Sequence, residues 1–140
     1  MQAKFFNGIN KDAKLIREEV FIQEQGFKNE FDEYDDYVDT LVLYNDQNEP
    51  IATARVYEID SVNKIYKLGR IAVRKQFRGL GLGRVLIDNL EKKAKELGAK
   101  EFYVSAQVRA VPFYNKCGYK EYGKQYMDEH VPHIDMKKLV

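Results

Sequence analysis

A glycine-rich segment flanked by cations is the part of this sequence best suited to bind a ligand. It runs from Arg74 to Arg84 as Arg-Lys-Gln-Phe-Arg-Gly-Leu-Gly-Leu-Gly-Arg, between a buried strand and a helix. Alternating glycines are costly in chain entropy, and no Ser, Thr, Asp or Asn in the segment can cap the helix. The first helical N–H groups therefore lack an obvious acceptor, and four cations crowd the positive end of the helix dipole: Arg74, Lys75, Arg78 and Arg84. An anion with several oxygens would explain all three features, so the segment predicts a phosphate site.

Two common nucleotide-binding loops do not fit these residues. A P-loop has Lys-Ser or Lys-Thr after its last glycine, whereas Gly83 is followed by Arg84 and Val85. A dinucleotide-binding loop has a third glycine where Arg84 stands. It also has an acidic residue at the end of the next strand, where this sequence reads Ser105-Ala106-Gln107. The phosphate ligand is therefore of another kind.

A few other side chains have types that could take part in chemistry. Tyr114 could act as an acid, because a phenol has an ordinary pKa of about 10, or it could be a core residue. Glu24, at the end of the first predicted helix, could act as a base through water or could be a solvated carboxylate. The spacing of His130 and His133 predicts no metal site, and His133 is expected to support the last strand. Cys117 is not expected to be a nucleophile, because it should lie on a packed helix.

An acidic stretch, residues 30–39, carries six carboxylates and no cation. We expect a loop or short helix there. Its carboxylates could attract a cationic amine through their local field, or they could simply be solvated. The carboxylates are Glu30, Asp32, Glu33, Asp35, Asp36 and Asp39.

Hydrophobic periodicity predicts the elements that must position these groups. The first half should contain a strand at 3–6, a helix at 11–25, and an antiparallel meander of strands at 40–44, 51–57 and 65–73. A helix at 81–97 then presents one apolar stripe: Leu82, Val85, Leu86, Leu90, Ala94 and Leu97. A strand at 101–106 can return parallel to 65–73, followed by a helix at 111–117 and strands at 119–126 and 133–138. The predicted class is α+β with a mixed sheet.

The composition limits the possible classes of protein. The chain of 140 residues suits a single domain, 1–140, and its net charge of +1 argues against a nucleic-acid binder. No apolar run approaches the roughly 18 residues of a membrane span, and Met1 to Asn10 does not resemble a signal peptide. Because Cys117 is the only cysteine, no internal disulfide can form, and we expect a cytoplasmic protein.

The motifs together resemble those of a known family. Gln76-Phe77-Arg78-Gly79-Leu80-Gly81 is similar to the Q/R-x-x-G-x-G/A signature of the GNAT superfamily of acetyl-CoA-dependent N-acetyltransferases, and residues 78–83 fit it in a second register. Residues 69–73 look like the fourth strand of that family. The segment from Ala110 to Tyr119 resembles its A-x-x-F-Y-x-x-x-G-F/Y pattern. Short matches resemble the ElaA-like branch: Arg17, Val20-Phe21, Glu24-Gln25 and His133-Ile134-x-Met136.

The resemblance implies a GNAT-like fold and a set of binding residues for acetyl-CoA. The strand Ile71, Ala72 and Val73 would pair with the pantetheine arm, and an N–H near Val73 could stabilise the oxyanion. Tyr114 would protonate the departing thiolate. Gln107 stands where many members have Asn, and Cys117 stands where Leu is common. The pyrophosphate would be held by Arg78, Gly79, Leu80, Gly81, Leu82, Gly83 and Arg84.

The leading hypothesis is therefore an acetyltransferase that acts on a primary amine of a small molecule or protein, with no metal. The sequence leaves the oligomeric state open, and the resemblance allows a homodimer because this family is often dimeric. One alternative is a catalytically inactive acyl-CoA-binding sensor on the same fold, which would not need Tyr114. Another is a nucleotide-binding module of a different fold, which selective binding of ATP would support. The sequence does not identify the acceptor amine.

Overall fold

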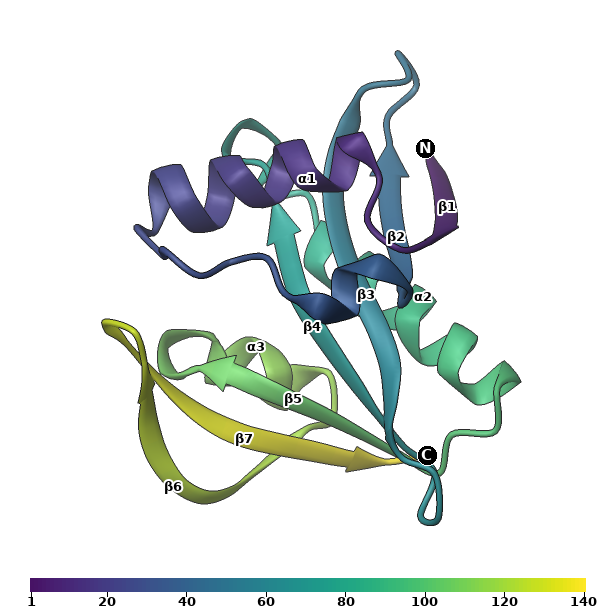
Figure 1. The fold of residues 1–140 in the computed structure, drawn as a ribbon, viewed down its shortest axis with the longest axis vertical. Helices are drawn as coiled ribbons and strands as arrows, with labels where there is room; N and C mark the ends of the chain where they lie inside the picture. Colours follow the sequence, from purple (N-terminus) through teal and green to yellow (C-terminus); the bar gives the residue numbers. More distant parts are fainter.

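The computed structural model describes residues 1–140 and is built around a seven-stranded sheet of order β1-β2-β3-β4-β5-β7-β6 (Figure 1). The β4–β5 pair is parallel and all other neighbours are antiparallel. The α+β class, the meander and the parallel return after the long helix are therefore confirmed. The strands are β1 Gln2–Asn7, β2 Asp39–Tyr44, β3 Pro50–Asp60, β4 Ile65–Val73, β5 Glu101–Gln107, β6 Lys120–Asp128 and β7 Val131–Leu139.

The two central strands pair over only part of their length. Residues Ile65 to Leu68 of β4 face Glu101 to Val104 of β5, and no pairing follows. Beyond Leu68 the strands diverge, and Figure 1 shows β5, β7 and β6 turning away from β4. On its other side, β4 stays paired with β3 as far as Val73. One edge of β4 is thus left without a strand neighbour, and the sheet opens into a fork.

A backbone irregularity in β4 lies where the fork begins. Arg70 has a φ of +51°, a left-handed conformation that is uncommon for a residue with a side chain. The register between β3 and β4 shifts at the same place, between Thr53 and Arg55. Such a bulge bends a strand and increases its twist. The bulge therefore gives β4 a reason to leave β5 after only four paired residues.

The first helix begins as predicted and changes its hydrogen bonding partway. Asn10 caps α1 (Lys11–Arg17) by accepting from the N–H of Ala13 at 2.8 Å. The helix continues as a π-helical turn, η1 (Glu18–Glu24), and such turns occur frequently at functional sites. The buried side of α1 packs on one face of the sheet, whereas α2 (Leu82–Glu96) covers the other face (Figure 1).

The apolar stripe of α2 differs from the predicted one at two positions. Leu97 is 48% exposed, because the helix ends at Glu96 and the chain turns away, whereas Ile87 is fully buried. Glu91 is also buried, where it accepts from the Tyr119 hydroxyl at 2.7 Å and from Lys138 Nζ at 3.0 Å. The stripe follows a strict 3.6-residue period and shares its face with one paired carboxylate.

Two of the remaining short elements follow the predictions closely. The acidic stretch contains a 3-10 turn, η2 (Glu33–Asp36), and α3 spans Val111–Lys116. Two further 3-10 turns, η3 (Lys75–Phe77) and η4 (Val108–Ala110), follow β4 and β5. None of the helices combines the length and the apolar character needed to cross a bilayer.

Candidate active site

The glycine loop joins the open end of β4 to α2. Gly79 and Gly81 have φ values of +82° and +75°, where a side chain would be strained, and Gly81 is the N-cap of α2. Gly83 serves packing instead, because a Cβ there would lie 3.1 Å from the ring of Phe113. The three glycines therefore shape the loop and let α2 approach α3 closely.

The backbone of this loop is rich in free donors. From Gly79 to Arg84, no backbone N–H has an acceptor within the chain, and no side chain caps α2. Consecutive free N–H groups at a helix N-terminus form a favourable site for an anion. This part of the phosphate-site argument agrees with the observed geometry.

The argument from the loop cations needs correction. Arg74 Nε lies 2.9 Å from Glu19 Oε2, and Arg84 Nε lies 3.1 Å from Asp88 Oδ1. Arg78 pairs with Glu24, with Nη1 2.5 Å from Oε2. Only Lys75 has no carboxylate partner among the four. Carboxylates of the chain itself thus offset three cations, and no ligand is needed to do so.

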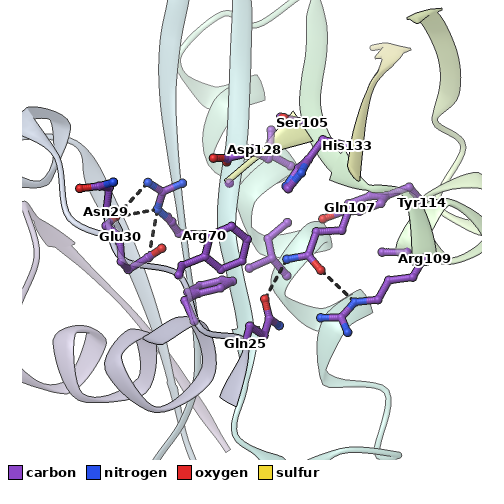
Figure 2. A pocket seen from close by; sticks show the side chains of 16 residues that line it. Gln25, Asn29, Glu30, Arg70, Ser105, Gln107, Arg109, Tyr114, Asp128 and His133 are labelled. Atoms are coloured by element: carbon purple, nitrogen blue, oxygen red, sulfur yellow. Dashed lines mark hydrogen bonds and ion pairs between the residues drawn. The ribbon is translucent and has the colours of Figure 1, made fainter. Parts of the chain in front are cut away.

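A cavity of about 240 Å³ lies at the fork (Figure 2). It is lined by the end of η1 and the loop after it, by β4 beyond the paired segment, by the end of β5, and by α3. The tips of β6 and β7 complete it with Asp128 and His133. Ile71 lines the cavity, whereas Ala72 is buried in the cluster beneath α1. The edge of β4 predicted to bind pantetheine thus borders an open space.

Tyr114 lies on α3 and reaches this cavity. It is both a member of the core, at 8% exposure, and a lining residue, so its two sequence interpretations are compatible. Its hydroxyl has no hydrogen-bond partner in the chain and is not sealed from solvent. Burial raises the pKa of Tyr114 well above its ordinary value, and the nearby Cys117 adds to this. The phenol is therefore protonated at neutral pH and free to donate.

Glu24 lies apart from Tyr114. Both of its carboxylate oxygens accept from Arg78, and this hydrogen bond lowers the pKa of Glu24 despite some desolvation. Glu24 lines two shallow depressions outside the cavity that Tyr114 enters. The structure therefore brings Glu24 to the glycine loop, and its predicted role as a base stays a prediction.

Comparison with known proteins agrees with this geometry. Residues 10–140 match the GNAT acetyltransferase domain family. The uncharacterized N-acetyltransferase YjcF of Bacillus subtilis is 39% identical over 131 residues, which cover 91% of each chain. The chain belongs to the GNAT superfamily of N-acetyltransferases. The same fold occurs in Escherichia coli ElaA (TM-score 0.85, 21% identity, 98% of each chain) and in an acyl-CoA N-acyltransferase from Pseudomonas aeruginosa (TM-score 0.85, 22% identity, 99% of each chain). In fold, the ElaA likeness agrees with the branch expected from the sequence.

Membership of this family implies an acyl-CoA donor and an acceptor for the acetyltransferase. The residues present fit such a donor in two ways: the loop offers unpaired N–H groups, and the edge of β4 offers an unpaired backbone beside the cavity. Gln107, at the end of β5, lines the cavity and is held in place on both sides. Its Nε2 donates to Gln25 Oε1 at 2.8 Å, and its Oε1 accepts from Arg109 Nε at 2.9 Å (Figure 2).

The six carboxylates of the acidic stretch fall into two sets, and one set (Glu33, Asp36 and Asp39) has no cationic partner, with Glu33 and Asp36 exposed. The other three carboxylates pair with arginines from α1, β3 and β4. Arg17, only 1% exposed, lies 2.8 Å from Glu30 and 2.5 Å from Asp35. The attraction of a cationic amine to these three carboxylates is thus a wrong expectation, because their charge is neutralised internally. The network comprises Arg17, Arg55, Arg70, Glu30, Asp32 and Asp35.

Burial and pairing act in opposite directions inside this network. Burial raises the pKa of Glu30 and outweighs its arginine partners. For Asp35, burial alone would raise the pKa, but the hydrogen bond from Arg17 and further bonds and charges hold it below the ordinary value. The network ties the loop after η1 to β4, and so fixes one wall of the cavity.

Several cavity residues were not predicted as site residues. Arg70, Ser105, Asp128 and His133 all line the cavity of the acetyltransferase (Figure 2). His133 does lie in the last strand, β7, as expected, but its ring also faces the cavity. Two signals could have identified some of them. The first was the two-residue period of β5, which places Ser105 and Gln107 on one face of the strand. The other was strand register, since Gln107 pairs with His133.

Proposed function

We propose that this acetyltransferase uses acetyl-CoA and transfers the acetyl group directly to a primary amine within a ternary complex. The single observation that carries the proposal is the run of free N–H groups from Gly79 to Arg84, placed at the mouth of the β4–β5 fork. A diphosphate accepts hydrogen bonds from such donors, and an extended amide chain pairs with a strand edge. Acetyl-CoA contains both parts in one molecule.

Each segment has a binding role in this proposal. The N–H groups of residues 79–84 hold the pyrophosphate, and the edge of β4 at Ile71, Ala72 and Val73 pairs with pantetheine. An N–H near Val73 stabilises negative charge on the carbonyl oxygen of the thioester. Gln107 offers its amide from the other arm of the fork. Together these contacts direct the thioester into the cavity.

In the reaction, the amine nitrogen forms a bond to the acyl carbon and the carbon–sulfur bond breaks. The departing thiolate takes the phenolic proton of Tyr114, which regains a proton from solvent. The raised pKa of Tyr114 keeps this proton in place until the sulfur becomes charged. Glu24 remains a predicted base, acting through water.

The alternative is an inactive acyl-CoA sensor on the same fold. It would use the loop in the same way but would have no need of Tyr114. The open hydroxyl of Tyr114 in a cavity with room for an acceptor favours the enzyme. A cytoplasmic location, a homodimer, a single domain over 1–140, and the absence of nucleic-acid, membrane and metal partners stay predictions.

The test is isothermal titration of the purified chain with acetyl-CoA, with ATP and NAD as controls. Micromolar or tighter binding of acetyl-CoA alone is expected. A second assay follows thiol release from acetyl-CoA with a panel of diamines, amino sugars, amino acids and lysine peptides. Binding without thiol release for any amine would favour the sensor, and no binding by the folded chain would overturn both readings.

A further inference from the structure

His133 is held at the cavity by contacts on several sides. It lies in β7 opposite Gln107 of β5, and it is only 6% exposed. The Tyr126 ring stacks on it at 6.0 Å between centroids with an interplanar angle of 26°, and Phe27 meets it edge-on at 6.4 Å. Figure 2 shows the His133 ring near Asp128 and Gln107, at the same cavity that Tyr114 lines. The ring is therefore positioned more firmly than a surface histidine.

The hydrogen bonds of the ring determine which nitrogen is free. Nδ1 lies 2.9 Å from the carbonyl oxygen of Val131. A carbonyl oxygen only accepts, so Nδ1 must carry the proton of the neutral ring. The lone pair of that ring is then on Nε2. Nε2 has no hydrogen-bond partner in the chain and is not sealed from solvent, so it is open to the cavity.

We propose that His133 is the general base of this acetyltransferase, with Nε2 accepting the proton of the attacking amine. This proposal rests on the proposed function. As the nitrogen–carbon bond forms and the carbon–sulfur bond breaks, Nε2 takes one proton from the amine and Tyr114 gives one to the thiolate. His133 then releases its proton to solvent and Tyr114 regains one. The two protons balance, so no other reactant is needed.

The charges around the ring suit this role. The titratable and charged groups that share the cavity with His133 are Glu30, Arg70, Arg109, Tyr114 and Asp128, and Tyr126 stacks on the ring. Arg70 pairs with Glu30 at 3.0 Å, and Arg109 donates to Gln107. Asp128 has no cationic partner. Asp128 is therefore an uncompensated negative group at the cavity that His133 lines.

The geometry favours His133 over Glu24 as the base. Both oxygens of Glu24 already accept from Arg78, and that hydrogen bond lowers the pKa of Glu24, which weakens it as a base. A neutral imidazole has an unshared electron pair on one ring nitrogen, and histidine is the side chain that most often acts as a general base. His133 also lines the same cavity as Tyr114, whereas Glu24 does not.

A first test needs no acceptor. Nitrogen-15 NMR of histidine-labelled protein identifies the protonated nitrogen of each neutral ring, and His130→Gln assigns the two signals. We expect the neutral ring of His133 to carry its proton on Nδ1. A proton on Nε2 would leave no lone pair toward the cavity and would overturn the proposal.

The second test is kinetic and uses the most active amine of the panel. His133→Gln and His133→Ala should lower kcat about 100-fold or more, with unchanged affinity for acetyl-CoA. The pH–rate profile of the native chain should change in both variants. Added imidazole should restore activity to His133→Ala, which leaves room for it, and not to His133→Gln. His130→Gln, which lies outside the cavity, is the matched control.

The outcomes separate the two proposals. If the native chain acetylates the amine and both His133 variants keep its kcat and pH profile, the role of His133 is overturned and the proposed function stands. A loss of kcat without imidazole rescue and with a native pH profile would make His133 merely structural. A native chain that consumes no acetyl-CoA with any amine would overturn the proposed function, and the role of His133 with it.

Discussion

Arg78 donates to both carboxylate oxygens of Glu24, with Nη1 2.5 Å from Oε2 and Nη2 2.6 Å from Oε1. Its Nε also donates to the Val73 carbonyl at 2.9 Å. One guanidinium thus joins the end of η1, the end of β4 and the start of the glycine loop, across 54 positions of sequence between Arg78 and Glu24. The pair holds the mouth of the fork together and neutralises a cation that the sequence assigned to phosphate binding.

Replacing Glu24 by Gln should tighten acetyl-CoA binding several-fold at low salt, because the charge of Arg78 is no longer offset. The gain should shrink at high salt, where the Debye length falls to about 3 Å at 1 M. Titration calorimetry at two salt concentrations measures both effects. The same variant also tests whether Glu24 is the base, because kcat should then fall. In that case the native rate should not rise between pH 5 and 8, because the lowered pKa of Glu24 keeps its carboxylate ionised over that range.

Lys75→Ala should reduce the salt dependence of acetyl-CoA binding more than Arg78→Ala does. Lys75 is the loop cation without a carboxylate partner, so its attraction to phosphate is not cancelled within the chain. Arg78→Ala should weaken binding mainly because the loop is then held less firmly, and this effect does not depend on salt. Equal salt slopes for the two variants would show that the Arg78–Glu24 pair opens when the ligand binds.

Tyr114→Phe should lower kcat about 100-fold while leaving the affinity for acetyl-CoA and the thermal stability close to native. The phenyl ring keeps the packing of α3, and the hydroxyl removed has no partner within the chain. Because an acid must be protonated and burial raises the pKa of Tyr114, the native rate should not fall with rising pH until above about pH 10. A variant with the native kcat would show that a group other than Tyr114 is the acid.

Gly81→Glu should abolish acetyl-CoA binding, because it adds a side chain and a negative charge where the N–H groups converge. Gly98→Glu is a matched control at the other end of α2. Both glycines are exposed, have positive φ values of +75° and +97°, and have no atom within 4 Å of an added Cβ. The two variants should therefore share a cost of about 1 kcal/mol in backbone strain. Retained binding in a folded Gly81→Glu chain would remove the loop from the site.

Arg17→Met should destabilise the fold by about 3–5 kcal/mol, because it removes a buried cation that both Glu30 and Asp35 contact. Arg84→Met is the control, since the Arg84–Asp88 pair is exposed and such pairs contribute little to stability. Urea unfolding of both variants measures the difference. Similar small losses would mean that water reaches the Arg17 network and replaces the lost charge.

The sequence by itself determined the order and type of the main elements and the free backbone donors of the glycine loop. These features depend on local chemistry. Periodicity fixes which face of α2 is apolar, and three glycines with no capping residue leave the N–H groups after Gly79 free wherever the loop lies. The prediction was wrong at the end of α2, where Leu97 was expected in the apolar stripe but is exposed.

The tertiary structure alone decided which distant charges meet and which side chains share the cavity. Arg17 finds Asp35 across 18 positions, Arg70 finds Glu30 across 40, and Arg78 finds Glu24 across 54. Each contact depends on strand register and on the bulge near Arg70 that accompanies the divergence of β4 and β5. Pairing between distant segments carries no local periodic signal. The sequence therefore supplied the reactive groups, and the fork brought His133 and Tyr114 to one cavity while holding Glu24 at the loop.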